Sequence, residues 1–200
     1  HFYTPSGVMG FLGRVTYNYK ERYLLEVNAG YNGNEQFIEG NRFGLFPAYS
    51  AGWVVSNESF FRENRWLTFL KLRGSYGEVG NDQLNSNRRY LYLPSTFNLG
   101  QSGYFFGTSD GSVTNPQFAG GVEGSLGNPN VTWERSAKTN AGLDARFLRD
   151  KLSVTTDYFT EKRTGILTML DQIIPYAYGV PASSTPPDNV GSVSNKGFEL

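Results

Sequence analysis

The sequence predicts an all-β fold, an antiparallel sheet of the kind that forms a transmembrane β-barrel. Apolar and polar residues alternate over several runs of this 200-residue chain, which is the pattern of strands with two different faces. The runs exceed the ~5–6 residues usual for strands of globular proteins. Short and long links alternate between the runs, as in outer-membrane barrels. Together these observations favour a barrel segment of about six to eight membrane-spanning strands.

Residues 23–32 show the alternation most clearly. One face carries Tyr23, Leu25, Val27, Ala29 and Tyr31, and the other carries Leu24, Glu26, Asn28, Gly30 and Asn32. At ~3.3 Å per residue, the run from Tyr23 to Tyr31 spans about 26 Å. A tilt of ~40° reduces this length to roughly 20 Å of height, close to the apolar band of an outer-membrane barrel with an aromatic girdle at each edge.

Further runs repeat the pattern with some exceptions. The predicted strands cover residues 11–20, 45–55, 66–76, 136–147 and 152–159. Phe46, Leu67, Phe69 and Phe159 fall on the polar side, and Pro47 would remove a ladder hydrogen bond from its strand. A last strand is expected to begin near Gly197 and to run off the end of the chain, so we expect a segment of a longer protein.

Charged residues mark the face that avoids lipid. They lie mid-strand on the side of the small polar residues, and in a barrel this side lines the lumen. The predicted lumen-facing residues are Arg14, Glu26, Lys71, Arg73, Lys138, Asp144 and Arg146. In a soluble sandwich the same side would face water, and the apolar side would form the core. Alternation alone does not separate the two arrangements, but the strand lengths favour the barrel.

The links between the predicted strands fall into two classes. Residues 20–22 and 148–151 are tight turns, and residues 56–65 are a short link with a helical turn that Ser56 is expected to cap. Residues 33–43, 77–132 and 163–196 are long links. We therefore expect short periplasmic turns and long extracellular loops, with the first strand running toward the periplasm. A hairpin around residues 89–92 is expected inside the longest loop.

Composition excludes several functional classes. Eighteen basic residues balance eighteen acidic ones, so charge gives no reason to expect nucleic acid as a partner. The chain has no Cys and one His, His1, so no thiolate metal site is predicted. No run approaches the ~20 apolar residues of a membrane-spanning helix. Nucleophile-elbow, phosphate-loop, zinc and calcium patterns are missing, so we predict no enzyme activity, cofactor or metal.

Several short strings resemble a known family when they are taken in order. The strings are residues 73–81 (RGSYGEVGN), 128–134 (NPNVTWE), 140–144 (NAGLD), 157–159 (DYF) with 162–164 (KRT), and 189–191 (NVG) with 195–199 (NKGFE). In this order and spacing they resemble the C-terminal half of the barrel in SusC/RagA-type TonB-dependent transporters of Bacteroidota. The resemblance extends from about Gly10 to Leu200.

This resemblance implies a barrel of about 22 strands with an N-terminal plug, of which residues 1–200 would be one partial barrel domain. It implies an outer-membrane transporter that imports glycans or peptides together with a SusD-like lipoprotein. It also implies TonB as a partner, reached through a plug that these 200 residues do not contain.

Two interpretations remain open for each of two groups of candidate residues. The lumen-facing charges either pair with one another and touch the plug, or contact the substrate. The candidate substrate-binding residues are Tyr90, Tyr92, Tyr104, Phe105, Phe106 and Arg73. The aromatic ones among them either stack on the substrate or pack the loop against itself or against the lipoprotein. The predicted membrane girdle is Tyr23, Tyr31, Trp53, Trp66, Tyr76 and Phe147.

Two other functions compete with a transporter segment. A soluble surface β-sandwich that binds carbohydrate would fold alone in buffer, whereas an open part of a barrel would aggregate at its unpaired edges. A passive porin would lack the plug.

Overall fold

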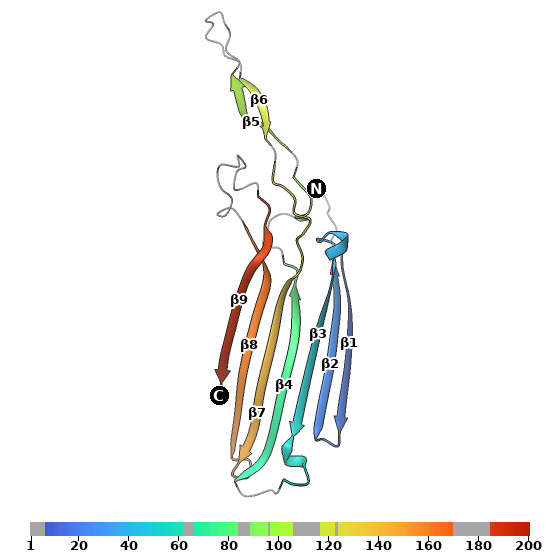
Figure 1. Ribbon diagram of the computed structural model, residues 1–200, viewed down its shortest axis with the longest axis vertical. Helices are drawn as coiled ribbons and strands as arrows, with labels where there is room; N and C mark the ends of the chain where they lie inside the picture. The colour runs from blue at the N-terminus through green and yellow to red at the C-terminus, as the bar shows by residue number, and fades with distance from the viewer. Residues whose placement is uncertain are drawn as a thin grey trace, which may run out of the picture.

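The computed structural model describes residues 7–61, 66–83, 89–95, 97–105, 117–122, 124–169 and 185–200, which form two antiparallel sheets (Figure 1). The strands of the main sheet are β1 (Val8–Tyr19), β2 (Tyr23–Asn34), β3 (Phe43–Val54), β4 (Leu67–Asn81), β7 (Glu134–Phe147), β8 (Leu152–Thr168) and β9 (Asp188–Glu199). A separate hairpin consists of β5 (Asn98–Phe105) and β6 (Gln117–Val122). In this described part, no helix is long and apolar enough to cross a membrane.

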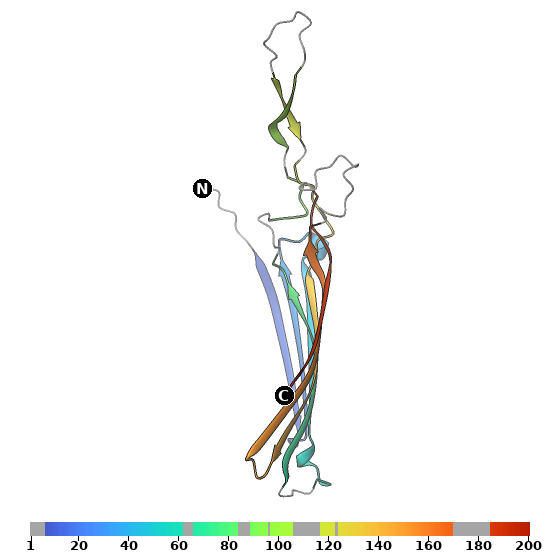
Figure 2. The same ribbon diagram turned by 90° about the vertical axis from the view of Figure 1, so that its left-hand side faces the viewer.

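The main sheet has the order β1-β2-β3-β4-β7-β8-β9 and every neighbouring pair is antiparallel. Its short turns lie at one end, here called the turn end, after Tyr19 and Phe147. The links beyond Asn34, Asn81 and Thr168 lie at the other end, the loop end. Figures 1 and 2 show the β5–β6 hairpin projecting beyond the loop end. The short turns after β1 and β7 and the long links after β4 and β8 agree with the prediction, whereas the β2–β3 link (residues 35–42) is shorter than the β3–β4 link (residues 55–66).

The turn between β1 and β2 shows how local chemistry fixes the turn end. Lys20 and Glu21 have φ angles of 51° and 54°, as in a type I′ turn, whose twist matches that of the flanking strands. The Arg22 amide donates to the Tyr19 carbonyl oxygen at 3.0 Å, and the Glu21 amide donates to Asn18 Oδ1 at 2.9 Å. The turn therefore closes on its own hydrogen bonds and sets the register of β1 against β2.

Four expectations need correction, two on strand ends and two on links. The strand predicted for residues 152–159 continues to Thr168, and the strand expected to begin near Gly197 begins at Asp188. Residues 89–92 form a bend and a turn rather than a hairpin, because the hairpin of this loop is β5–β6. Ser56 lies within the 3₁₀ turn η2 (Val55–Asn57) and does not cap it, since Val54 precedes the turn without a side-chain hydrogen bond.

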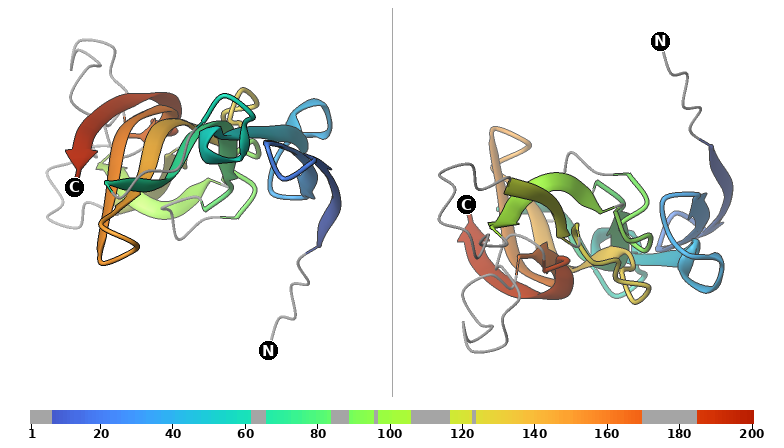
Figure 3. Two further views of the ribbon diagram at one scale, coloured as in Figure 1. Left: turned by 90° about the horizontal axis from the view of Figure 1, so that it is seen from below. Right: turned by 90° about the horizontal axis from the view of Figure 1, so that it is seen from above.

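The two faces of the sheet differ in the way that the sequence predicts. Along β2, exposed residues alternate with half-buried ones, and the exposed ones are the apolar set that begins with Tyr23 and Leu25. We call this side the apolar face, and the opposite side, which carries Glu26, the polar face. A soluble sandwich buries its apolar face, so the exposure here contradicts that alternative. Figure 3 shows the sheet nearly edge-on as an open wall with β1 and β9 far apart.

One compact core packs the loop end. Phe37, Phe46, Leu91, Val131 and Trp133 are all at least nine-tenths buried and form one cluster. The Trp133 ring lies 5.2 Å from the Phe37 ring and 5.3 Å from the Phe46 ring. These residues come from three segments that are far apart in the sequence. The cluster therefore fixes the long links to one another, and it explains why Phe46 breaks the alternation.

Pro47 marks the point where β3 parts from β4. The β3–β4 ladder runs from Ala48 to Val54, whereas the β2–β3 ladder continues to Phe43. Proline lacks an amide donor and suits a strand edge without a neighbour. Beyond Pro47, the Leu45 carbonyl oxygen accepts a hydrogen bond from the Arg135 guanidinium at 3.4 Å instead.

Replacing Trp133 by Ala should open the loop end locally. The change removes a buried ring and its hydrogen bond to the Arg42 carbonyl oxygen (3.1 Å), and such core truncations cost about 3–5 kcal/mol. Hydrogen exchange in the purified protein should accelerate in residues 37–42 and 124–133 and stay unchanged in the strands. Phe60→Ala, at an exposed ring near the turn end, is the control. Unchanged exchange in Trp133→Ala would contradict the role of the cluster.

Candidate functional site

Arg73 is the centre of an ion-pair network on the polar face. Its Nη2 atom lies 2.5 Å from Asp157 Oδ2 and its Nε atom 3.3 Å from Asp144 Oδ2. The register places Arg73 opposite Gly142 and Gly142 opposite Asp157. A Cβ atom on Gly142 would come within 2.7 Å of the guanidinium carbon. Glycine therefore leaves the space in which the Arg73 side chain crosses β7 to reach β8.

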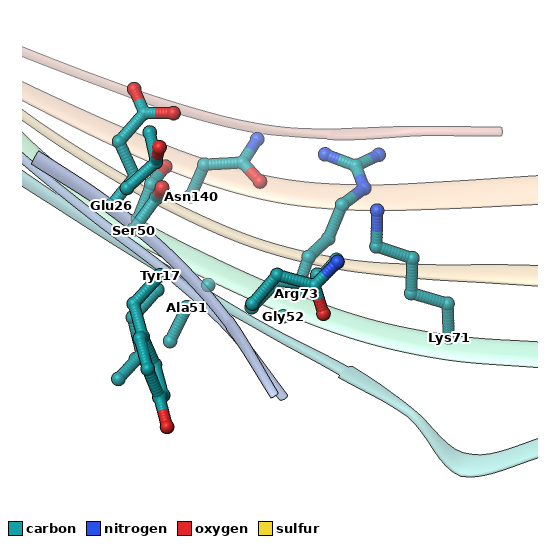
Figure 4. A pocket seen from close by; sticks show the side chains of 14 residues that line it. Tyr17, Glu26, Ser50, Ala51, Gly52, Lys71, Arg73 and Asn140 are labelled. Atoms are coloured by element: carbon teal, nitrogen blue, oxygen red, sulfur yellow. The ribbon is translucent and has the colours of Figure 1, made fainter. Parts of the chain in front are cut away.

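A pocket of about 550 Å³, lined by residues of both faces, lies beside this network. Figure 4 shows Glu26, Asn140, Lys71 and Arg73 on one side of the strands, and Tyr17 on the other. Carboxylate, amide and cationic groups from β2, β4 and β7 thus share one surface. Such a surface holds water or polar ligands, and no pair of groups in it has the geometry of a nucleophile with its base.

Two further ion-pair groups lie on the same face. Arg14 Nη2 is 2.7 Å from Glu26 Oε1, which also accepts a hydrogen bond from Asn28 Nδ2 at 2.7 Å. Glu161 accepts a hydrogen bond from Ser136 Oγ at 2.6 Å. Lys138 Nζ (3.9 Å) and Arg163 Nη2 (3.4 Å) also approach the Glu161 carboxylate. Charges on this face are consequently paired across neighbouring strands in most cases.

The seven predicted lumen residues divide into pairs and single groups. Arg14 meets Glu26, and Arg73 meets Asp144. Lys138 meets Glu161, which is not among the predicted residues because the predicted strand ended at Phe159. Extending the alternating pattern two residues beyond Phe159 would have placed Glu161 on the polar face. Lys71 lines the pocket, and the Arg146 guanidinium lies 4.9 Å from the centre of the Phe69 ring.

The candidate aromatic residues are not brought together with Arg73. The Tyr90 hydroxyl donates to Glu35 Oε1 at 3.2 Å, and Arg89 donates to the same oxygen at 2.9 Å. The pKa of Tyr90 is raised by burial first and by this hydrogen bond second. The Tyr92 ring meets the Tyr90 ring edge-on at 6.0 Å. Both tyrosines thus belong to the packing of the loop end, whereas Arg73 lies in the middle of β4.

Two of the other three aromatic candidates lie in β5. Tyr104 and Phe105 are at the end of that strand, and Tyr104 is paired with Phe118. Phe106 falls outside the described residues.

Asparagine side chains tie the long links to β8 and β9. Asn189 Nδ2 donates to the Gly165 carbonyl oxygen at 2.6 Å and to the Thr132 carbonyl oxygen at 3.0 Å. Asn189 Oδ1 accepts from the Thr132 amide at 2.9 Å. Asn128 Nδ2 donates to the Pro187 carbonyl oxygen at 3.0 Å. These contacts give a structural reason for two of the strings noted in the sequence, NPNVTWE and NVG.

Aromatic rings gather at two levels of the apolar face. Near the turn end, Tyr23 lies 6.4 Å from Tyr19 and 6.5 Å from Trp53, with the rings stacked. Near the loop end, Tyr31 stacks on Phe43 at 5.1 Å. Tyr19 and Phe43 are not among the girdle residues that the sequence predicts. The predicted girdle residues Trp66 and Tyr76 are exposed, and Phe147 is half-buried.

Glu58 fixes the rings at the turn end. Its carboxylate accepts a hydrogen bond from Trp53 Nε1 at 3.1 Å and lies 3.5 Å from Arg22 Nη1. Hydrogen bonds from Tyr23 and then Trp53 hold the pKa of Glu58 below its ordinary value, and the charge of Arg22 adds to this. One carboxylate in the β3–β4 link therefore orients two rings of the apolar face.

Within the described ranges, no three His, Cys, Asp or Glu side chains are placed to hold a metal ion.

An open antiparallel wall with an exposed apolar face, aromatic rings at two levels and a charged opposite face defines a segment of a membrane β-barrel. The chain belongs to the TonB-dependent receptor-like β-barrel family, whose sequence profile matches residues 4–200. This family is located in the outer membrane of Gram-negative bacteria.

Individual relatives agree with the family assignment. The chain is 29% identical to the TonB-dependent receptor SusC of Bacteroides thetaiotaomicron over 197 residues, which is 98% of this chain and 18% of SusC. It is also 29% identical to a TonB-dependent receptor of Formosa agariphila, covering 99% of this chain and 18% of the relative. The chain thus spans less than a fifth of the length of these relatives.

Solved structures share the fold. The RagAB peptide importer in its open-open state matches with a TM-score of 0.74 and 24% identity, over 96% of this chain and 19% of that one. The siderophore receptor PirA of Pseudomonas aeruginosa matches with a TM-score of 0.56 and 11% identity, over 96% and 30%. The family and the exposed apolar face together contradict the soluble sandwich.

Asp157→Asn should lower the melting temperature more than Asp144→Asn. Asp157 makes the shorter contact with Arg73, and its side chain is 14% exposed, against 28% for Asp144. Loss of its charge leaves a half-buried guanidinium without its nearest partner. Thermal unfolding of both variants in detergent checks this order, and an equal fall for the two would contradict it.

The contribution of Glu58 to stability should disappear in acid. A carboxyl whose pKa is lowered in the folded state stabilises that state above its ordinary pKa, and this is lost as the pH falls through the folded-state pKa. The difference in melting temperature between the wild type and Glu58→Gln should therefore be constant near neutral pH. It should shrink from about pH 5 downward. A difference that grows with acid would contradict the assignment.

Proposed function

We propose that this chain is part of the barrel wall of a TonB-dependent transporter in the outer membrane of a member of the Bacteroidota. The observation that carries the proposal is the exposed apolar face with its two levels of aromatic rings, within a chain that matches the family over residues 4–200. Residues 1–200 act as one partial barrel domain, and the complete barrel has about 22 strands. The rest of the barrel closes the open edges at β1 and β9, since unpaired edges are unstable in lipid.

We propose import as the activity, with a glycan or a peptide as substrate. SusC is a TonB-dependent receptor and RagAB is a peptide importer, which supports this class of function. A SusD-like lipoprotein covers the loop end as the partner in uptake. TonB supplies the energy through a plug outside these 200 residues. No catalytic step, cofactor or nucleic acid takes part.

We assign the polar face to the lumen and the rings to the membrane interfaces. Lumen-facing Arg14, Glu26, Lys71, Arg73, Lys138, Asp144 and Arg146 line the path or meet the plug. Their pairing across strands, as for Arg73 with Asp144 at 3.3 Å, supports a structural role for most of them. Lys71 has no such pair in the described region and lies at the pocket, which makes it the better candidate for contact with the substrate or the plug. Tyr23, Tyr31, Trp53, Trp66, Tyr76 and Phe147 form the girdles.

Among the aromatic candidates, Tyr90 and Tyr92 support the loop end, because Glu35 and Arg89 already engage Tyr90 and the Tyr92 ring packs against the Tyr90 ring. Tyr104 and Phe105 are the better candidates for contact with substrate or lipoprotein, since their hairpin projects beyond the sheet (Figure 2). We keep Phe106, which lies outside the described residues, as a candidate on its sequence alone.

Adjacent residues of β3 provide a matched test of the two faces. The chain has no Cys, so Ser50→Cys and Ala51→Cys can each carry a nitroxide in a cysteine-free form of the complete protein in bilayers. A label at residue 51 should collide with oxygen dissolved in lipid. A label at residue 50 should collide with a water-soluble nickel complex. Water accessibility at both positions would contradict the membrane wall.

Uptake tests the transport function itself. Deleting the gene that encodes the complete protein should abolish growth on the glycan or peptide mixture that induces it and leave growth on monomeric nutrients unchanged. A tagged copy should co-purify a surface lipoprotein from the outer membrane. Full growth of the deletion strain on every inducing mixture would refute the proposal.

A further inference from the structure

The apolar face carries a row of cations on the loop-end side of the Tyr158 and Phe198 rings. On β8, Lys162 lies four residues beyond Tyr158 toward the loop end, and on β9, Lys196 lies two residues beyond Phe198. Tyr158 and Phe198 are paired in register and are 51% and 66% exposed. At ~3.3 Å per residue and a tilt of ~40°, the lysine positions lie about 10 Å and 5 Å above the rings.

Alternation assigns these lysines to the apolar face. Lys162 has Glu161 and Arg163 as its neighbours in the chain. These two residues form an ion pair, and Glu161 accepts a hydrogen bond from Ser136 on the polar face. Lys162 therefore points the other way, as Tyr158 does. On β9, Gly197 faces the Phe159 ring on the polar side, so Lys196 and Phe198 point to the apolar side.

The register brings the lysines close together. Lys162 is paired with Ser194, and Lys196 is the next residue of β9 on the same face. Diagonal neighbours of this kind are about 7–8 Å apart. On the other flank, Lys162 is paired with Ala137, and Arg135 is the diagonal neighbour on β7. The three cations thus follow one line across three strands.

The three cations differ in how they are engaged. Arg135 Nη1 lies 3.1 Å from Glu78 Oε2, and its guanidinium covers the Phe46 ring at 5.3 Å. Lys162 and Lys196 are exposed, and within the described residues no ion pair occupies either of them. Glu78 offsets Arg135, so the row keeps the charge of two ammonium groups.

A lipid-facing wall rarely tolerates such charge without a partner. The cost of Lys on the lipid face is greatest at the bilayer midplane and falls toward the interfaces. At the level above the rings, a long Lys side chain extends toward the headgroups. An ammonium group there meets phosphate, the anion that it binds as a point charge.

We propose that Lys162 and Lys196, flanked by Arg135, bind the phosphate groups of a phosphorylated glycolipid in the outer leaflet. This inference rests on the proposed orientation of the wall, with the loop end outside. The lysines hold the lipid against β8 and β9, where the Tyr158 and Phe198 rings contact its acyl chains. The site is a lipid contact of the outer face and takes no part in the substrate path.

The complete protein, purified in detergent and stripped of lipid, provides the test. Native mass spectrometry would measure its binding of bisphosphorylated lipid A and of the same lipid after removal of both phosphates. The wild type should bind the phosphorylated form at least tenfold more tightly. Lys162→Gln with Lys196→Gln should lose this preference, and Lys162→Arg with Lys196→Arg should keep it.

The matched control is Lys20→Gln with Lys151→Gln, which removes the same charge at the turn end and should leave the preference intact. Equal binding by the wild type and the Lys162/Lys196 double Gln variant would overturn the proposal. Full competition by millimolar inorganic phosphate would also overturn it, because the site would then take free anions.

Membrane fractionation of each variant, and its heat-dependent migration in gel electrophoresis, distinguish a failure of the proposed function from a failure of this lipid site. A wild-type protein outside the outer membrane refutes the proposed function. A wild-type protein in the outer membrane, with a double Gln variant that binds lipid normally, refutes this site alone.

Discussion

The continuous antiparallel ladder is the constraint on which the rest of this structure depends. In lipid, no water satisfies the backbone, so every amide and carbonyl in the wall needs a partner in a neighbouring strand. Seven strands meet this need from β1 to β9. Once the ladder fixes the register, a shift of one residue would move every apolar side chain to the charged side. The faces, the ring levels and the ion pairs are therefore consequences of one alignment.

Glycines allow large side chains to cross this ladder. Gly142 leaves space for Arg73 on its way to Asp157, and Gly197 lies beneath the Phe159 ring. Covering a strand glycine with an aromatic side chain protects its backbone and helps to fix register. This pairing explains why Phe159 stands on the polar side. The alternation is broken where a ring has a glycine to cover, so the exception follows from cross-strand packing.

The local sequence predicts a strand where the two faces of that strand meet different surroundings. The prediction fails where both faces carry similar residues. Residues 23–32 alternate sharply, and the structure has a strand there. The first part of β9, Asp188 to Asn195, consists of small and polar residues with one valine on each face, Val190 and Val193, so its strand has no periodic signal. In β8 the ladder shifts register near Gly165, whose φ is 69°, and the alternation is lost. The sequence contains no local sign that Phe37 and Trp133 meet, because only the tertiary fold brings them together.

The distribution of packing along the chain separates a fixed wall from variable loops. The wall contains ion pairs and ring contacts, while the buried apolar cluster lies at the loop end. That cluster and the Asn128 and Asn189 hydrogen bonds bind three long links into one platform. The β5–β6 hairpin begins beyond this platform, so its residues can change without disturbing the ladder. Specificity can therefore diverge in the hairpin while register, faces and ring levels stay the same.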